Sequence, residues 1–231
     1  MTGMGAVLQR DLRDLLRTNA FRIGAIALTV VTIGGAIGAS IAFNRWEFLE
    51  QQPAAITKPV LELILGAIVY FLTLFILMIF MMIYTAEPIT KEKANGNIES
   101  LLATPLSPRA IWMGKSLAAF LPAFILAVFS SLIIVLAVNF TAIHPITHSF
   151  VFPAPVLFTG FFINPLLTLG LTALIVFLCL AYNPEITALP TWVVFMGLMF
   201  GIGIGLGLGK INLASWWPFT LCYLAGAIVL G

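Results

Sequence analysis

The chain alternates between long apolar runs and short polar stretches from residue 23 to its end. Residues 23–43 and 63–84 contain no charged residue, and each has roughly the 20 apolar residues that a helix needs to cross a membrane. Neither run alternates between apolar and polar positions, as the strands of a membrane barrel would. The pattern predicts six transmembrane helices, at about 23–43, 60–84, 109–138, 156–182, 190–208 and 214–231.

A different pattern precedes the first span, where residues 6–21 have an apolar and a polar side at helical spacing. The apolar positions are Val7, Leu8, Leu12, Leu15 and Leu16, and the charged positions around the other side are Arg10, Asp11, Arg13, Asp14 and Arg17. An ordinary soluble helix is one interpretation. Because a span follows at once, we expect an amphipathic helix in the membrane interface, with Arg10, Arg13 and Arg17 reaching for lipid phosphate.

The composition agrees with a membrane protein. Hydrophobic residues make up 61% of the chain, charged residues only 9%, and the mean hydropathy is +1.11. A soluble domain carries about 25% charged residues, so a soluble fold of this length could not bury so much apolar surface. We predict an all-α, multi-pass protein of the cell membrane (plasma or inner), with an N-terminal interfacial helix (residues 1–21) and a six-helix transmembrane domain (residues 22–231).

The basic residues predict the orientation of the spans. Six spans place both termini on one side of the membrane. That side carries Arg10, Arg13, Arg17, Arg22, Lys91, Lys93, Arg109 and Lys115, and the other side carries Arg45, Lys58 and Lys210. The positive-inside rule therefore places both termini in the cytoplasm. The net charge of +2 gives no sign of a nucleic-acid partner, and we expect none.

The longest polar stretch between two spans, residues 85–116, also lies on this side. Proline disfavours a helical residue before it, so Glu87-Pro88 is expected to end or bend the helix of the second span. Gly96-Asn97 predicts a turn, or a C-cap followed by an N-cap. Ser107-Pro108 predicts the start of the third span's helix, with serine as N-cap and proline at the first helical position.

Between these signals lies a predicted short helix, Ile98 to Ala103, which Thr104-Pro105 ends. Ile98, Leu101 and Leu102 line one face of this helix. A helix of this length is marginal alone, so its apolar face must pack against another part of the chain or against a partner. A plain connecting loop is the alternative, and the lysines around it are expected to act as topology determinants.

The residues of this stretch resemble a family pattern. Glu92, Gly96, Glu99, Leu101-Leu102 and Pro105 to Ser107, followed six residues later by Gly114-Lys115, are similar to the segment between the second and third spans of type-2 ABC exporter permeases. The pattern there is E-x-x-x-G-x-x-E-x-L-L-x-x-P-L-S, then G-K. Two departures are Asn97, where threonine is usual, and a short sixth span without a tail.

The resemblance implies that residues 85–108 form a cytoplasmic coupling segment and that Ile98 to Ala103 is its coupling helix. This helix would dock on a separate ABC ATPase subunit, which binds ATP and Mg²⁺, while this chain binds no cofactor. The residues implied in docking are Glu92, Gly96, Asn97, Ile98, Glu99, Leu101, Leu102 and Pro105. The resemblance also implies a second permease copy, as a homodimer or with a related permease, besides contact with membrane lipid.

Two patterns suggest chemistry that the sequence does not support. Gly114-Lys115-Ser116 ends like a phosphate-binding loop, but Arg109 stands where that loop needs glycine, so we expect no ATPase site and no catalytic residue. His144 and His148 are four residues apart, with Pro145 between them. No cysteine or carboxylate lies nearby, so we interpret this pair as structural and expect no metal site.

Small and polar residues within the spans have two interpretations. Gly201, Gly203, Gly205, Gly207 and Gly209 alternate through the fifth span and allow either close helix packing or bending as a gate opens. Gly34 and Gly38 allow close packing in the first span. Ser130, Ser131, Asn164, Thr168 and Thr172 suggest hydrogen bonds between helices or a polar lining of a substrate route. Asn164-Pro165 is also a candidate break in the fourth span, and Asn139 to Pro155 a structured loop.

These features favour the permease subunit of an ATP-driven exporter. Apart from Arg109 and Lys115 at the start of the third span, Glu62 is the only charged residue within the predicted spans, and it lies near their outer end. Ion relays need charged groups inside the membrane. A hydrophobic or amphipathic cargo is therefore expected. The alternatives are a secondary transporter, a membrane-embedded enzyme, and an assembly or regulatory membrane subunit that does not transport.

Overall fold

The computed structural model describes residues 3–44, 54–103, 106–152 and 154–182, and beyond these residues 193, 196–197, 199–201, 203–205, 208, 220–222 and 224–226. Every secondary-structure element in this part of the chain is helical, which confirms the all-α prediction. The fifth and sixth predicted spans fall mostly outside the described residues and stay predictions.

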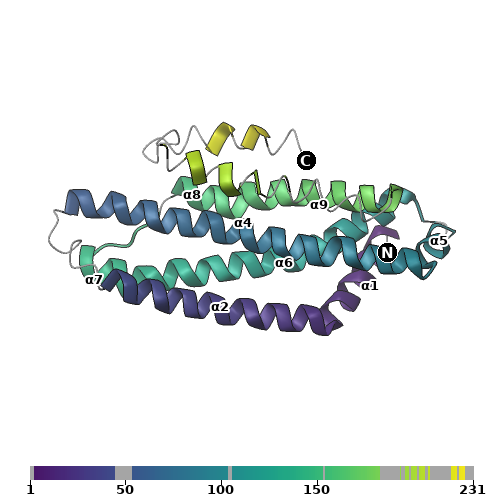
Figure 1. The fold of residues 1–231 in the computed structure, drawn as a ribbon, viewed down its shortest axis with the longest axis horizontal. Coiled ribbons are helices and arrows are strands. Elements are labelled where there is room, and N and C mark those ends of the chain that lie inside the picture. Colours follow the sequence, from purple (N-terminus) through teal and green to yellow (C-terminus); the bar gives the residue numbers. More distant parts are fainter. Residues whose placement is uncertain are drawn as a thin grey trace.

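Four helices are long and apolar enough to cross a membrane, and they lie side by side along the long axis of the molecule (Figure 1). They coincide with the first four predicted spans. They contain α2 (Asn19–Asn44), α4 (Ala54–Ala94), α6 (Pro108–Val138), and a helix built from α8 (Ala154–Phe158), η2 (Thr159–Ile163) and α9 (Asn164–Ala181).

Helix α4 is the centre of this bundle. Its N-terminal half packs Leu61, Leu65 and Val69 against Val135 and Val138 of α6, all of them buried. Further along, buried residues of the same helix join a second cluster with α9. That cluster includes Tyr70, Leu74, Met78, Leu167, Leu171 and Ile175. Helix α4 therefore contacts most of the other described helices.

The second span extends further than the sequence predicts. We expected Glu87-Pro88 to end or bend its helix, but α4 runs through Pro88 as far as Ala94. An internal proline costs a helix about 3 kcal/mol. Side chains beyond the proline offset this cost, because Ile89 is buried in the core and Glu92 forms an ion pair with α6. The predicted end of the helix at this proline is therefore wrong.

The fourth span is not broken at Asn164-Pro165, contrary to the sequence-based candidate. One π-helical turn, η2, comes directly before Asn164, and the helix then continues to Ala181. The wider turn accommodates the proline, which has no N–H to donate. Asn164 is buried and donates from Nδ2 to the carbonyl of Tyr70 at 3.3 Å, which fixes this turn against α4.

The segment predicted as a structured loop, Asn139 to Pro155, is partly helical. It begins with a π-helix, η1 (Asn139–Ile143), followed by the short helix α7 (His144–Thr147). The Asn139 side chain is fully buried and exchanges two hydrogen bonds with the backbone of Val151, at 2.8 and 3.0 Å. This one amide closes the connection between α6 and α8 at the α7 end of the bundle.

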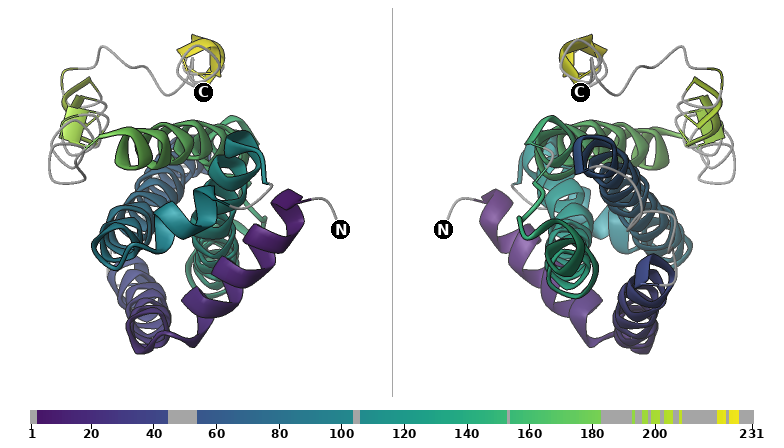
Figure 2. Two further views of the ribbon diagram at one scale, coloured as in Figure 1. Left: turned by 90° about the vertical axis from the view of Figure 1, so that its right-hand side faces the viewer. Right: turned by 90° about the vertical axis from the view of Figure 1, so that its left-hand side faces the viewer.

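The N-terminal helix α1 (Gly3–Arg17) crosses the opposite end of the bundle at a steep angle to the long helices (Figure 2). Thr18 separates it from α2 and caps both, since its hydroxyl donates to Leu15 O at 2.7 Å and accepts from Phe21 N at 3.2 Å. Arg10, Arg13 and Arg17 are exposed. The sequence therefore predicted the helix, while its place in the membrane interface stays a prediction.

Candidate functional site

The predicted coupling segment, residues 85–108, lies at the tip of the molecule where the ends of α4 and α6 meet. The short helix α5 (Asn97–Leu102) lies there (Figure 1), between a glycine turn at Gly96 and a serine cap at Ser107. Gly96 has φ 70°, the left-handed conformation that ends α4, and its N–H donates to Lys93 O at 3.0 Å. A side chain at this position would strain the backbone by roughly 1–2 kcal/mol, so glycine is required for the turn.

The start of α6 is capped as the sequence predicts. The Ser107 side chain accepts a hydrogen bond from Ala110 N at 3.2 Å, and Pro108 occupies the first turn. Together, the glycine turn and the serine cap fix where α4 ends and where α6 begins. Helix α5 is therefore held between two defined helix ends.

The apolar face of α5 is partly used within the chain itself. Ile98 is only 4% exposed and belongs to the core cluster against which Trp112 of α6 packs. Leu101 is half-buried and Asn97 is exposed. The side chains of Glu99 and Leu102, and all of Pro105, lie outside the described part of the chain. Ile98 thus anchors α5 to the buried core, and Asn97 lies on the outer surface of the tip.

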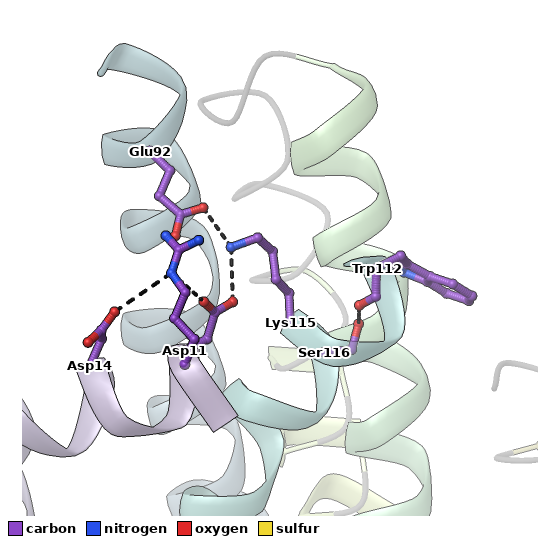
Figure 3. Close-up of polar contacts among 7 residues, drawn as sticks. Asp11, Asp14, Glu92, Trp112, Lys115 and Ser116 are labelled. Atoms are coloured by element: carbon purple, nitrogen blue, oxygen red, sulfur yellow. Dashed lines mark hydrogen bonds and ion pairs between the residues drawn. The ribbon is translucent and has the colours of Figure 1, made fainter. Parts of the chain in front are cut away.

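At the base of the tip, a buried lysine joins three helices (Figure 3). Lys115 Nζ of α6 lies 2.6 Å from Glu92 Oε2 of α4 and 3.0 Å from Asp11 Oδ2 of α1. The lysine side chain is 5% exposed, and the two carboxylates are 15% and 22% exposed. A buried ammonium requires such partners, because an unpaired buried charge is strongly unfavourable.

This Asp11–Lys115–Glu92 cluster, hereafter the ion cluster, differs from what the sequence suggested. We expected Asp11 on the polar side of an interfacial helix and Lys115 to act as a topology determinant, yet both side chains face the protein interior. The sequence held one signal of a buried lysine, because Lys115 stands between Gly114 and a long apolar run. Its partners could not be identified from the sequence, because they come from elements 104 and 23 residues away.

A cavity of about 170 Å³ adjoins the ion cluster, and its wall includes Asp14, Thr85 and all three members of the cluster. Thr85 is 1% exposed, and its hydroxyl has no hydrogen-bond partner among the described residues. Arg10 lies on the outer side, with its Nε 3.8 Å from Asp11 and 4.0 Å from Asp14. The base of the tip is therefore polar inside, although apolar helices surround it.

Two further hydrogen bonds tie α9 to this end of the bundle. Trp112 Nε1 of α6 donates to Ala173 O at 2.6 Å, and Lys93 Nζ of α4 donates to Tyr182 O at 2.8 Å. The second bond reaches the C-cap residue of α9. Lys93, which precedes α5 in sequence, and Trp112, which follows it, thus both bind the helix of the fourth span or its C-cap.

Polar residues within the spans form bonds between helices in some places only. Thr73 of α4 and Ser131 of α6 are 2.8 Å apart through their hydroxyl oxygens. Thr168 and Thr172 donate to carbonyls of their own helix, at Asn164 and Thr168. Ser130 is buried as well.

The glycines of the first and fifth predicted spans are only partly described by the structure. Gly201, Gly203 and Gly205 are helical, and a Cβ added at Gly203 would lie 4.0 Å from Phe71. Gly207 and Gly209 fall outside the described residues. A Cβ added at Gly34, Gly38 or Gly201 would meet no described atom within 4 Å. Packing at these three positions therefore does not occur within the described part of the chain.

The two histidines lie near α7, at the opposite end of the bundle. The His144 ring packs on Phe150 with 5.0 Å between ring centroids, and His148 has φ 50° after α7. Within the described residues, no group of three His, Cys, Asp or Glu residues could hold a metal ion.

Comparison with known families identifies the family of the chain. A family model described as ABC-2 family transporter protein matches residues 24–226, which is most of the chain. No curated protein and no solved structure gives a significant match.

Proposed function

The chain belongs to the ABC-2 family of transporter proteins, as a permease subunit that works with an ABC ATPase subunit, and from this premise we propose that it is an exporter permease whose α5 docks on that ATPase. The observation that carries the proposal is the capped helix α5 at the tip formed by α4 and α6. Its docking residues would be those named by the family pattern, with Asn97 and Leu101 near the surface.

ATP binding and hydrolysis would take place on the partner, which would hold ATP and Mg²⁺. Displacement of α5 would reach the bundle through α4 and α6, because α5 is anchored to both by Ile98 and by the fixed helix ends at Gly96 and Ser107. Two copies of the chain, or one copy and a related permease, would form the transport route between them in the cell membrane.

A hydrophobic or amphipathic cargo is favoured by the distribution of charge. In the described spans, charged residues lie toward the helix ends: Arg22 in the first span, Glu62, Glu87, Lys91, Glu92 and Lys93 in the second, and Arg109 and Lys115 in the third. The fourth span, from Ala154 to Ala181, has no charged residue. An ion-driven transporter would need charged groups deeper in the membrane.

The test replaces Leu101 and Leu102 with aspartate and measures how much ABC ATPase subunit co-purifies with the permease. We expect at least a tenfold loss of the ATPase, since two charges would have to be buried in an apolar contact. The matched control replaces both leucines with methionine, which keeps the face apolar and should preserve binding. Full retention of the ATPase by the aspartate variant would contradict the docking role of α5.

A further inference from the structure

Helix α1 is attached to the tip along one face, at positions spaced four residues apart. A Cβ at Gly3 would contact Leu106, just before α6, and a Cβ at Gly114 would lie 2.9 Å from Val7 Cγ1. Asp11 then binds Lys115. Residues 3, 7 and 11 share one side of a helix, so α1 follows the linker between α5 and α6 and the first two turns of α6.

The ion cluster is the polar end of this attachment. Lys115 is shared between α1 and α4, and water screens its contacts weakly because its side chain is 5% exposed. The other basic residue beside Asp11 is Arg10, whose side chain is 51% exposed and whose contacts are longer. Lys115 therefore links α1 and α4 through one buried ammonium, besides the packing of Leu15 against the cluster that contains Phe80 and Tyr84.

From α1 the attachment continues to the first span. Thr18 alone separates α1 from α2, and its hydroxyl bonds to both sides of the junction. Phe21, on the first turn of α2, packs against Phe80 and Tyr84 of α4 at 6.1 and 5.6 Å between ring centroids. A displacement of α1 would thus move the start of α2.

The remainder of α2 packs on the described chain along one side, mainly against α6. Its outward side chains are largely exposed, for example Ile23 at 67% and Val30 at 64%. The buried residues of α2 are confined to a few positions on one side, Phe21, Thr32, Ala36 and Ser40. Within the described residues, α2 is therefore held from one side only.

We propose that the ion cluster fastens α1 to the coupling segment, so that displacement of α5 by the ATPase is carried through α1 to α2. Lys115 is a positioning residue in this proposal, which rests on the proposed function. Motion of the tip would then reach the first span directly, besides passing through α4 and α6.

The test measures the distance between spin labels on α2 and α9 in the permease–ATPase complex in lipid nanodiscs, with and without ATP and vanadate. Labels are placed at Ile26→Cys and Phe177→Cys, which are 65% and 53% exposed, in a chain with Cys179→Ala and Cys222→Ser. Mixing with unlabelled copies isolates the distance within one chain.

The main variant is the triple change Asp11→Asn, Glu92→Gln and Lys115→Met. It removes the ion pairs without leaving a buried unpaired charge, so it is expected to fold. Lys115→Arg keeps the positive charge between the carboxylates, and Arg10→Gln is a matched control that removes a neighbouring charge outside the ion cluster.

In the parent complex we expect an ATP-dependent shift of the α2–α9 distance. The triple variant should lose this shift while it still retains the ATPase subunit, and the Lys115→Arg and Arg10→Gln variants should keep it. The proposal is overturned if the triple variant shifts like the parent, if Lys115→Arg loses the shift, or if a parent complex that hydrolyses ATP shows no shift. Failure of the parent to bind any ABC ATPase would instead contradict the proposed function.

Discussion

Lys115 shows how one side chain depends on partners distant in sequence. Moving an ammonium out of water is unfavourable by several kcal/mol unless opposite charges and hydrogen bonds replace the water. Glu92 and Asp11 supply both, at 2.6 and 3.0 Å. The sequence placed Lys115 correctly near the start of the third span's helix. It could not show that Asp11 faces inward, because α1 alone has helical positions that suit either an interfacial or a packed orientation.

A stability measurement checks this account of Lys115. Replacing it with methionine leaves two carboxylates near each other and largely buried, so we expect the free energy of unfolding to fall by roughly 2 kcal/mol. The triple neutral variant should recover most of that loss. Thermal unfolding of the detergent-solubilised chain provides the comparison, and equal stability of the lysine and methionine forms would show that the ion pairs contribute nothing.

Whole helices were more predictable than their irregularities. Apolar runs predicted the first four spans, and Gly96 and Ser107-Pro108 predicted the boundaries around α5, since both signals act within a few residues. The failures involve proline. Pro88 and Pro165 both lie within helices, because contacts with other helices or a π-helical turn compensate for the missing hydrogen bond. Such compensation depends on tertiary neighbours that local patterns do not contain.

Glycines on the helices give a matched prediction. A Cβ at Gly160 of η2 would lie 3.1 Å from Val69 Cγ1 of α4, whereas one at Gly34 of α2 would meet no described atom. Gly160→Leu should therefore overpack the contact between the second and fourth spans and lower stability by about 1–3 kcal/mol. Gly34→Leu should leave the unfolding temperature of the single chain unchanged. Equal effects of the two substitutions would contradict the packing described for these spans.

The two ends of the molecule differ in the side chains that hold the helices together. At the α7 end, the Asn139–Val151 hydrogen bonds close a short connection, and exposed aromatic residues such as Phe140 and Phe152 surround it. At the other end, α1, α4 and α6 meet at the ion cluster, and α5 connects α4 to α6 at the tip. Family membership implies an ABC ATPase partner, whereas its action at the α5 end is our proposal, and the six-span topology and the pairing of two copies stay predictions.

The most direct test of the central claim is site-specific photo-crosslinking at Ala103, an exposed position directly after α5. A photoreactive amino acid there should capture an ABC ATPase subunit, identified by mass spectrometry, in membranes that contain the assembled complex. The same amino acid at His148, exposed at the opposite end, is the control and should not capture it. Capture of the ATPase from His148 but not from Ala103, or capture of only lipid or a second permease copy from Ala103, would contradict the claim.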